Sequence, residues 1–352
     1  MENQINIVGA GPAGLTAAIV LAKHGYKPTV YEMSPDVGHR MSGDFQGLEN
    51  WSMDKDIIAL IMELGIDVNF LCIPYYGGDI YAPKIAPLKI ESERPIFYLV
   101  KRGAENGSID NGLKEQAVYF GVKIVFNRRI ESVDGKTIIA EGPKRAGFIA
   151  AGITFDTETN DCAVVIFNDE IAPKGYAYLL INKGFGTMAA VIYKDFKNTK
   201  KYFKNLVNFF QNEKNIDIKN EKKFGGFGNF FIRNVNASGK KIYVGESAGF
   251  QDYLWGFGLR YAIVSGYLAA MSIITGSDYD SLCKKEIKPM LETSLVNRYL
   301  IEKFGDFGYR YIAKKFAKGN PCNFLKRNYN PSFLKSLILP IAKSRHKIHE
   351  NI

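Results

Sequence analysis

Cysteine, histidine and long apolar runs are all scarce in this chain of 352 residues. The four cysteines lie far apart and form no C-x-x-C pair, so the spacing indicates neither a zinc site nor a disulfide framework and is typical of a reducing compartment. No run approaches the roughly 18 apolar residues that a membrane-spanning helix needs, and the polar first residues are unlike a signal peptide. We therefore expect no bound metal, no transmembrane helix and a cytoplasmic location.

Acidic residues are absent from one long segment. Residues 310–347 hold ten Lys and Arg and no Asp or Glu, which accounts for the whole formal net charge of +10. Such a segment is attracted to anionic lipid by about 1 kcal/mol per basic residue near the surface. The alternative is a basic helix packed on the domain with solvated lysines. No recognised nucleic-acid motif accompanies the charge, so we expect no nucleic-acid partner.

A glycine-rich pattern opens the chain. The apolar run at 5–8 is followed by three glycines, a helix-forming run to Lys23, and a second apolar run that ends in an acid. In such a strand–turn–helix unit the glycines permit a tight turn, a close approach to a pyrophosphate, and close helix packing. The helix N-terminus offers free N–H groups to the phosphates, and the acid accepts from ribose hydroxyls and disfavours a 2′-phosphate. We expect FAD or NAD here, bound by Gly9, Gly11, Pro12, Ala13, Gly14 and Glu32.

A second glycine-rich stretch favours FAD. Residues 240–276 resemble the second FAD-binding motif of the para-hydroxybenzoate hydroxylase and geranylgeranyl reductase group of flavoproteins, with Glu246, Tyr253 and Trp255 as departures from its Asp, Pro and Thr. The resemblance implies that a helix beginning near Gly258 points its N-terminus at the pyrimidine edge of the flavin, where it would stabilise negative charge. The cofactor contacts that it implies are Gly245, Glu246, Gly256, Gly258 and Leu259.

Two shorter segments carry the same resemblance. Residues 98–125 resemble the group's strand, arginine and helix, which places Arg102 against the cofactor; a solvated surface arginine is the alternative. Residues 35–44 resemble a reductase loop in which Arg40 would pair with a phosphate of FAD and Gly43 would lie near the flavin ring. Ser42 stands where the reductases have a cysteine, which puts any thiol-dependent role in doubt. An ordinary polar surface loop is the alternative.

The middle of the chain is rich in strand-forming runs. Residues 150–157, 161–169, 175–182 and 187–194 are separated by turn residues and predict a sheet. Residues 172–193 also resemble the reductase segment that lines the isoprenoid pocket, with Pro173 and Tyr176 kept and Tyr178 in place of a tryptophan. Plain strand alternation with no ligand role is the alternative. We expect this sheet to form an apolar cavity against the flavin, with Tyr176 or Tyr178 as the proton donor.

Together these features predict an α/β chain, α+β overall, with a Rossmann-like FAD-binding domain, an inserted antiparallel β-sheet substrate domain and a helical C-terminal region. We assign 1–72, 93–150 and 240–276 to the FAD-binding domain, 73–92 and 151–239 to the substrate domain, and 277–352 to the basic C-terminal region.

The expected function is reduction of carbon–carbon double bonds in an isoprenoid or isoprenoid lipid. One alternative is an FAD-dependent monooxygenase acting on a small aromatic or apolar compound. Another is a flavin-bearing protein that mainly binds a membrane surface or a partner. No second dinucleotide-binding unit follows residue 150, so electrons would come from NAD(P)H without a dedicated domain or from a carrier such as ferredoxin. The basic C-terminal region would make a peripheral membrane contact.

Overall fold

A five-stranded parallel sheet forms one end of the molecule. The computed structural model describes residues 3–130, 135–230 and 240–346. The sheet has the order β15-β9-β1-β2-β8, and each neighbouring pair is parallel. Its strands are β1 (Gln4–Val8), β2 (Lys27–Tyr31), β8 (Lys123–Val125), β9 (Thr137–Ile139) and β15 (Lys241–Tyr243). The predicted Rossmann-like unit is confirmed.

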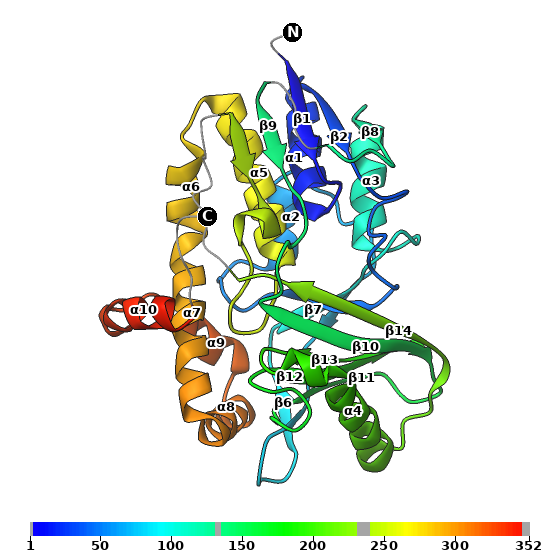
Figure 1. Cartoon of the computed structure of the whole chain (residues 1–352), viewed down its shortest axis with the longest axis vertical. Helices are drawn as coiled ribbons and strands as arrows, with labels where there is room; N and C mark the ends of the chain where they lie inside the picture. The colour runs from blue at the N-terminus through cyan, green and yellow to red at the C-terminus, as the bar shows by residue number, and fades with distance from the viewer. Residues whose placement is uncertain (1–2, 131–134, 231–239, 347–352) are drawn as a thin grey trace.

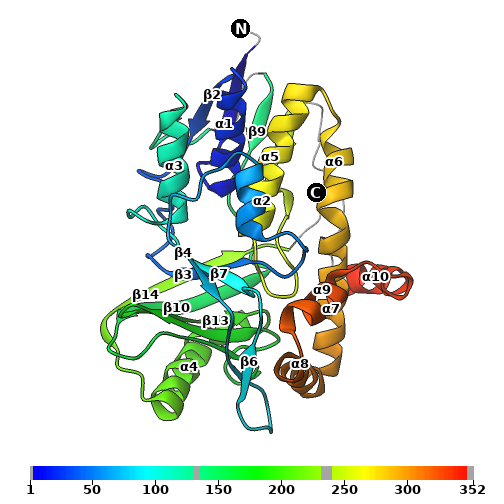
Figure 2. The same ribbon diagram turned by 180° about the vertical axis from the view of Figure 1, so that it is seen from behind.

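Three helices pack on this sheet: α1 (Pro12–Lys23), α3 (Ile109–Tyr119) and α5 (Leu259–Thr275). They lie side by side in both ribbon views, with α1 in the middle (Figures 1 and 2). Helix α1 has Pro12 in its first turn and nine buried residues from Ala13 to Leu21, and it stops before Gly25 at φ +81°. Ser108 caps α3 by accepting a hydrogen bond from the Asn111 amide at 3.1 Å. A short helix, α2 (Ile57–Glu63), completes this end.

A seven-stranded sheet forms the second layer, in the order β14-β10-β13-β12-β11-β5-β6. It contains β5 (Gly77–Tyr81), β6 (Leu88–Glu91), β10 (Phe148–Asp156), β11 (Cys162–Ile166), β12 (Tyr176–Asn182), β13 (Phe185–Ile192) and β14 (Lys219–Gly228). The predicted strands are present, but the sheet is mixed rather than purely antiparallel, because β5 runs parallel to β11. Strands β5 and β11 lie far apart in sequence and no hairpin joins them, so no tight turn sets their relative direction.

The inserted sheet also has a helix that the sequence analysis did not identify. Helix α4 (Thr199–Lys214) follows a short 3-10 turn and buries Tyr202, Leu206 and Phe210. These side chains join an apolar cluster with residues of β10 to β13. The helix therefore covers one face of the sheet and leaves the other face toward the parallel-sheet end (Figure 1).

Between the two ends lies a small antiparallel sheet of order β3-β7-β4. Its strands are β3 (Phe45–Glu49), β4 (Cys72–Tyr75) and β7 (Phe97–Lys101). Phe45 joins it to the large sheet, because its amide donates to the Thr187 hydroxyl at 2.9 Å and its ring packs with Phe185. This sheet joins segments that we assigned to different domains.

The C-terminal region is helical, as predicted. It contains α6 (Tyr279–Glu286), α7 (Lys288–Phe304), α8 (Asp306–Lys318), α9 (Pro321–Tyr329) and α10 (Phe333–Arg345). Helices α8 and α9 share an apolar cluster with β5, β6 and Trp51, and α10 packs on α7. No described helix is both long and apolar enough to cross a membrane. Lys347 and the rest of 347–352 lie outside the described residues.

Candidate functional site

The first glycine-rich turn has the shape that dinucleotide phosphates require. Gly9 has φ +105°, and a Cβ there would lie 2.4 Å from the Ala140 carbonyl oxygen. A Cβ on Gly14 would lie 2.1 Å from the Gly9 carbonyl oxygen, whereas one on Gly11 would meet no atom within 4 Å. Gly11 is the N-cap of α1 and provides no side-chain cap. The first turn of α1 thus presents its N–H groups to open space, which fits a pyrophosphate.

The second glycine-rich turn lies directly beside the first. Gly245 has φ +55°, and a Cβ there would lie 2.9 Å from the Ala13 Cβ. Its amide donates to the Ser265 hydroxyl at 2.8 Å, which ties the turn to α5. A Cβ on Gly266 would lie 2.2 Å from the Ala13 carbonyl oxygen. Two segments more than 200 residues apart in sequence therefore meet at the open end of α1.

The acid that ends β2 shapes the first turn. One Glu32 oxygen accepts from the Ala10 amide at 2.8 Å, and the other accepts from the Ser34 amide at 2.9 Å. A carboxylate has about four acceptor positions. The two that remain are available to the hydroxyls of a ribose, so the predicted role of Glu32 is compatible with its position.

Arg40 and Glu246 form an ion pair across the two motifs, with 3.0 Å between Arg40 Nη2 and Glu246 Oε2. Burial raises the pKa of Glu246, while Arg40 and Arg102 oppose the rise. Half of the Arg40 side chain is exposed. The pair therefore links the predicted phosphate-binding loop to the second turn.

Arg102 is buried and does not belong to the solvated surface. Its Nε and Nη2 atoms donate to the Asp110 carboxylate at 2.8 and 3.0 Å, and its Nη1 donates to Gln46 Oε1 at 3.0 Å. Asp110 and Asp44 raise the pKa of the guanidinium against the cost of its burial. The solvated alternative is wrong, and the contact of Arg102 with the cofactor stays a prediction.

Two glycines shape the loop that precedes α5. Gly256 has φ +75°, and Gly258 is the N-cap of α5 without a side-chain cap. Leu259 begins the helix and is buried. The N–H groups at this helix start thus meet the requirement of the predicted contact with the flavin edge.

A buried carboxyl within this loop is a feature that the sequence analysis missed. Asp252 is 2% exposed; it accepts from the Tyr329 hydroxyl at 2.8 Å and from the Trp255 amide at 2.5 Å. Burial raises its pKa from 3.8 to about 7 despite these bonds. The local sequence gives no signal for this, because Tyr329 lies 77 residues away in α9.

The two tyrosines proposed as proton donors lie two residues apart on the same face of β12, with ring centroids 6.3 Å apart. The Tyr176 hydroxyl donates to the Trp255 carbonyl at 2.6 Å, so its proton is already engaged. Among the described residues, the Tyr178 hydroxyl has no hydrogen-bond partner. Burial raises the pKa of both phenols above the ordinary value, so both remain protonated near neutral pH.

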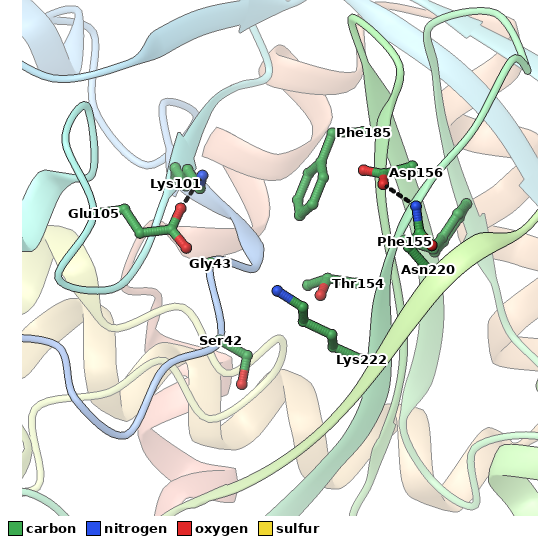
Figure 3. A pocket seen from close by; sticks show the side chains of 10 residues that line it. All are labelled: Ser42, Gly43, Lys101, Glu105, Thr154, Phe155, Asp156, Phe185, Asn220 and Lys222. Carbon is green, nitrogen blue, oxygen red and sulfur yellow. Dashed lines mark hydrogen bonds and ion pairs between the residues drawn. The ribbon is translucent and has the colours of Figure 1, made fainter.

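A pocket lies where the Ser42–Gly43 loop faces the inserted sheet (Figure 3). Gly43, at φ +75°, belongs to its wall with Phe155 and Phe185. The other lining residues are polar or charged: Ser42, Lys101, Glu105, Thr154, Asp156, Asn220 and Lys222. Lys101 pairs with Glu105, and Asn220 donates to Asp156 at 2.9 Å. This pocket is thus more polar than the apolar cavity that we expected, and neither Tyr176 nor Tyr178 lines it.

No described cluster of His, Cys, Asp or Glu has an arrangement that would hold a metal ion. All four cysteines are free thiols. Burial raises the pKa of all four thiols above the ordinary value. The cysteines are therefore poor nucleophiles.

Comparisons with known proteins agree with this geometry. Residues 7–50 match the model of the NAD(P)-binding Rossmann-like domain. The chain is 24% identical over 347 residues to the digeranylgeranylglycerophospholipid reductase of Thermoplasma acidophilum, covering 84% of each chain. By contrast, it aligns with only 34% of the length of an NAD-dependent dihydropyrimidine dehydrogenase subunit PreT homolog of Salmonella typhi, at 31% identity over 43% of this chain.

Solved structures extend the likeness to the whole fold. The geranylgeranyl bacteriochlorophyll reductase-like protein of Thermoplasma acidophilum superposes with a TM-score of 0.73, at 19% identity and 98% coverage of both chains. The flavin-dependent brominase Bmp2 superposes with a TM-score of 0.64, at 15% identity, covering 97% of this chain and 98% of that one. The chain therefore has the para-hydroxybenzoate hydroxylase-type flavoprotein fold, and over most of its length it is similar to a geranylgeranyl reductase-like protein and to a lipid reductase.

Proposed function

We propose that this chain binds FAD across the two glycine-rich turns and reduces carbon–carbon double bonds of an isoprenoid or an isoprenoid lipid. The main support is the likeness to the digeranylgeranylglycerophospholipid reductase of Thermoplasma acidophilum over 84% of each chain. The contact between Ala13 and Gly245 adds structural support, because one elongated dinucleotide would touch both turns.

The chain's own groups would have distinct roles. FAD supplies the redox chemistry when bound. The start of α1, Glu32 and Arg40 would hold the phosphates and the ribose, and Gly43 and the start of α5 would lie against the ring. The inserted sheet would exclude water from the reacting bond.

Of the two tyrosines, Tyr178 is the better proton donor. The Tyr176 proton is held by the Trp255 carbonyl, whereas the Tyr178 proton has no acceptor among the described residues. A substrate atom beside the Tyr178 hydroxyl would be its first acceptor and would lie within the hydrogen-bond reach that general acid catalysis requires.

The electron donor would be NAD(P)H, visiting without a domain of its own, or a carrier such as ferredoxin. A single parallel dinucleotide-binding sheet occurs in the described part of the chain, consistent with either donor. We place the protein in the cytoplasm, with a peripheral membrane contact.

Two measurements test the proposal. The purified protein should be yellow, with the flavin band near ~450 nm, and mass spectrometry should identify the apolar compound that co-purifies. Incubated anaerobically with dithionite and that compound, it should add two hydrogens per double bond. A colourless protein that takes up no FAD would refute cofactor binding, and a yellow protein that leaves the double bonds intact would refute the reductase activity.

The likeness to a flavin-dependent brominase supports a second candidate, an FAD-dependent monooxygenase. Air reoxidation of the reduced protein would then yield a hydroxylated aromatic or apolar product. A third candidate is a flavin-bearing protein whose main role is binding a membrane surface or a partner; it would be yellow and catalyse neither reaction.

A further inference from the structure

Helix α10 carries an apolar face that no described residue covers. Phe333, Leu334, Leu337 and Ile341 are between 55% and 76% exposed. At 100° per residue these positions fall within an arc of about 100° on one side of the helix. Among the residues that the structure describes, seven of the thirteen exposed large apolar side chains lie between residues 304 and 341, so exposure is concentrated in the C-terminal region.

The same helix is anchored by its other side. Ala342 is fully buried, and Ile338 and Leu339 pack against the main core beside α7. Lys343 pairs with Glu292 of α7 at 3.1 Å. Helix α10 is thus a fixed element with one apolar face packed and the other presented outward, and it projects from the body in both ribbon views (Figures 1 and 2).

The charge around this face selects its partner. Residues 321–345 contain Lys326, Arg327, Lys335, Lys343 and Arg345 and no acid. Lys326 pairs with Asp54 and Lys343 with Glu292, so Arg327, Lys335 and Arg345 carry the remaining charge. Two copies of the face would bring these like charges together, whereas an anionic surface would gain from each of them. An outward apolar helix face combined with basic residues is the arrangement that binds in the plane of a bilayer.

We propose that the exposed face of α10 docks the protein on the surface of an anionic lipid bilayer. Since no described helix is suited to cross a membrane, the contact would be peripheral. The inference deepens the proposed function, on which it rests for its purpose, because an isoprenoid lipid substrate would be reached at that surface.

The segment that leads into α10 is tied to the candidate site by hydrogen bonds. Tyr329, at the end of α9, donates to Asp252 in the loop before α5. Asn297 of α7 donates to the Asn328 carbonyl at 2.7 Å. The connection between α9 and α10 is therefore fastened near the loop that would abut the flavin.

The test is co-sedimentation of the full chain with vesicles of phosphatidylcholine alone or with phosphatidylglycerol added. We expect binding to the anionic vesicles. The double variant Leu334→Ser, Leu337→Ser should weaken it at least about tenfold, because two apolar side chains no longer enter the interface. The double variant Arg327→Gln, Arg345→Gln should weaken it about fivefold per charge and lessen the preference for anionic lipid.

The matched control removes two exposed apolar side chains elsewhere, Met62→Ser in α2 and Tyr119→Ser in α3, and should bind as the unchanged chain does. Equal loss in the control, or no binding by the unchanged chain, would overturn the proposal. So would a dimer of the unchanged chain in solution that the α10 variant converts to monomer, since the face would then bind a second copy.

Flavin absorbance and turnover of detergent-dispersed substrate are measured on the same preparations. A yellow, active protein that ignores vesicles contradicts the anchor alone. A protein that binds vesicles but is colourless contradicts the proposed function alone.

Discussion

At the scale of single residues, two glycines of the first turn should affect different properties: Gly11 the binding of the cofactor, and Gly14 the stability of the fold. A Cβ on Gly11 would meet no protein atom, whereas one on Gly14 would overlap the Gly9 carbonyl. We expect Gly11→Val to fold with a nearly unchanged melting temperature without cofactor, yet to bind FAD at least about tenfold more weakly, because its side chain enters the phosphate space. Gly14→Val, the matched control, should lower the melting temperature itself. Flavin titration and thermal melts of both variants check this, and normal FAD affinity in Gly11→Val would contradict it.

The buried Asp252 predicts a pH dependence of stability. Its pKa is about 7 in the folded protein and 3.8 in the reference state, so between these values the folded chain holds a proton that the unfolded chain has lost. The stability of the unchanged protein relative to Asp252→Asn should therefore fall as pH rises from about 4 to 7, by at most about 4 kcal/mol, and level off above. Melting temperatures of the two proteins across this range give the difference. A constant difference would show that the carboxyl does not titrate there.

The tyrosines of β12 should differ in what they lose. Tyr178→Phe removes a hydroxyl that has no hydrogen-bond partner among the described residues, and it should lower turnover with little change in stability. Tyr176→Phe removes the bond to the Trp255 carbonyl and should cost about 1 kcal/mol of unfolding free energy. Turnover, its pH profile and denaturant unfolding of both variants separate the roles. Full turnover in Tyr178→Phe would exclude it as the proton donor.

At the scale of elements, the contact between α1 and α5 brings the two motifs together. A Cβ on Gly266 would lie 2.2 Å from the Ala13 carbonyl oxygen, so Gly266→Leu must separate the helices. We expect it to destabilise the protein by about 3 kcal/mol or more and to release flavin. Ala262→Leu, in the same helix but only partly buried, is the control and should cost less. Thermal melts and flavin retention measure both.

Local sequence patterns predicted the helices and strands themselves better than the way these elements pair with one another. The helix-forming run to Lys23 and the four strands β10 to β13 of the inserted sheet follow from neighbouring residues, and these were predicted. The three-stranded sheet and the parallel pairing of β5 with β11 depend on contacts between distant segments, which no local pattern encodes. In the site, the glycine turns were predictable for the same reason. The pairing of Asp252 with Tyr329 was not, because it joins two segments through burial.

At the scale of the molecule, the C-terminal region divides into a structural part and a peripheral part. Helices α8 and α9 bury Tyr309, Phe316 and Leu325 in a cluster with Trp51, and Tyr329 bonds to Asp252. Helix α10 buries only Ala342 completely. Chain removal at different points should therefore have different effects.

Truncation after Asn330 removes α10 and should leave a yellow protein whose melting temperature falls by a few degrees, because most of the lost surface was already exposed. Truncation after Tyr309 also removes Phe316, Leu325 and Tyr329, and with them the packing under the loop before α5. It should yield insoluble or colourless protein, since each buried side chain of this size contributes about 1.5–3 kcal/mol. Soluble yield, flavin content and melts of the two truncations decide the matter. If both stayed folded and yellow, α8 and α9 would be as peripheral as α10, and the bond between Tyr329 and Asp252 would not support the site.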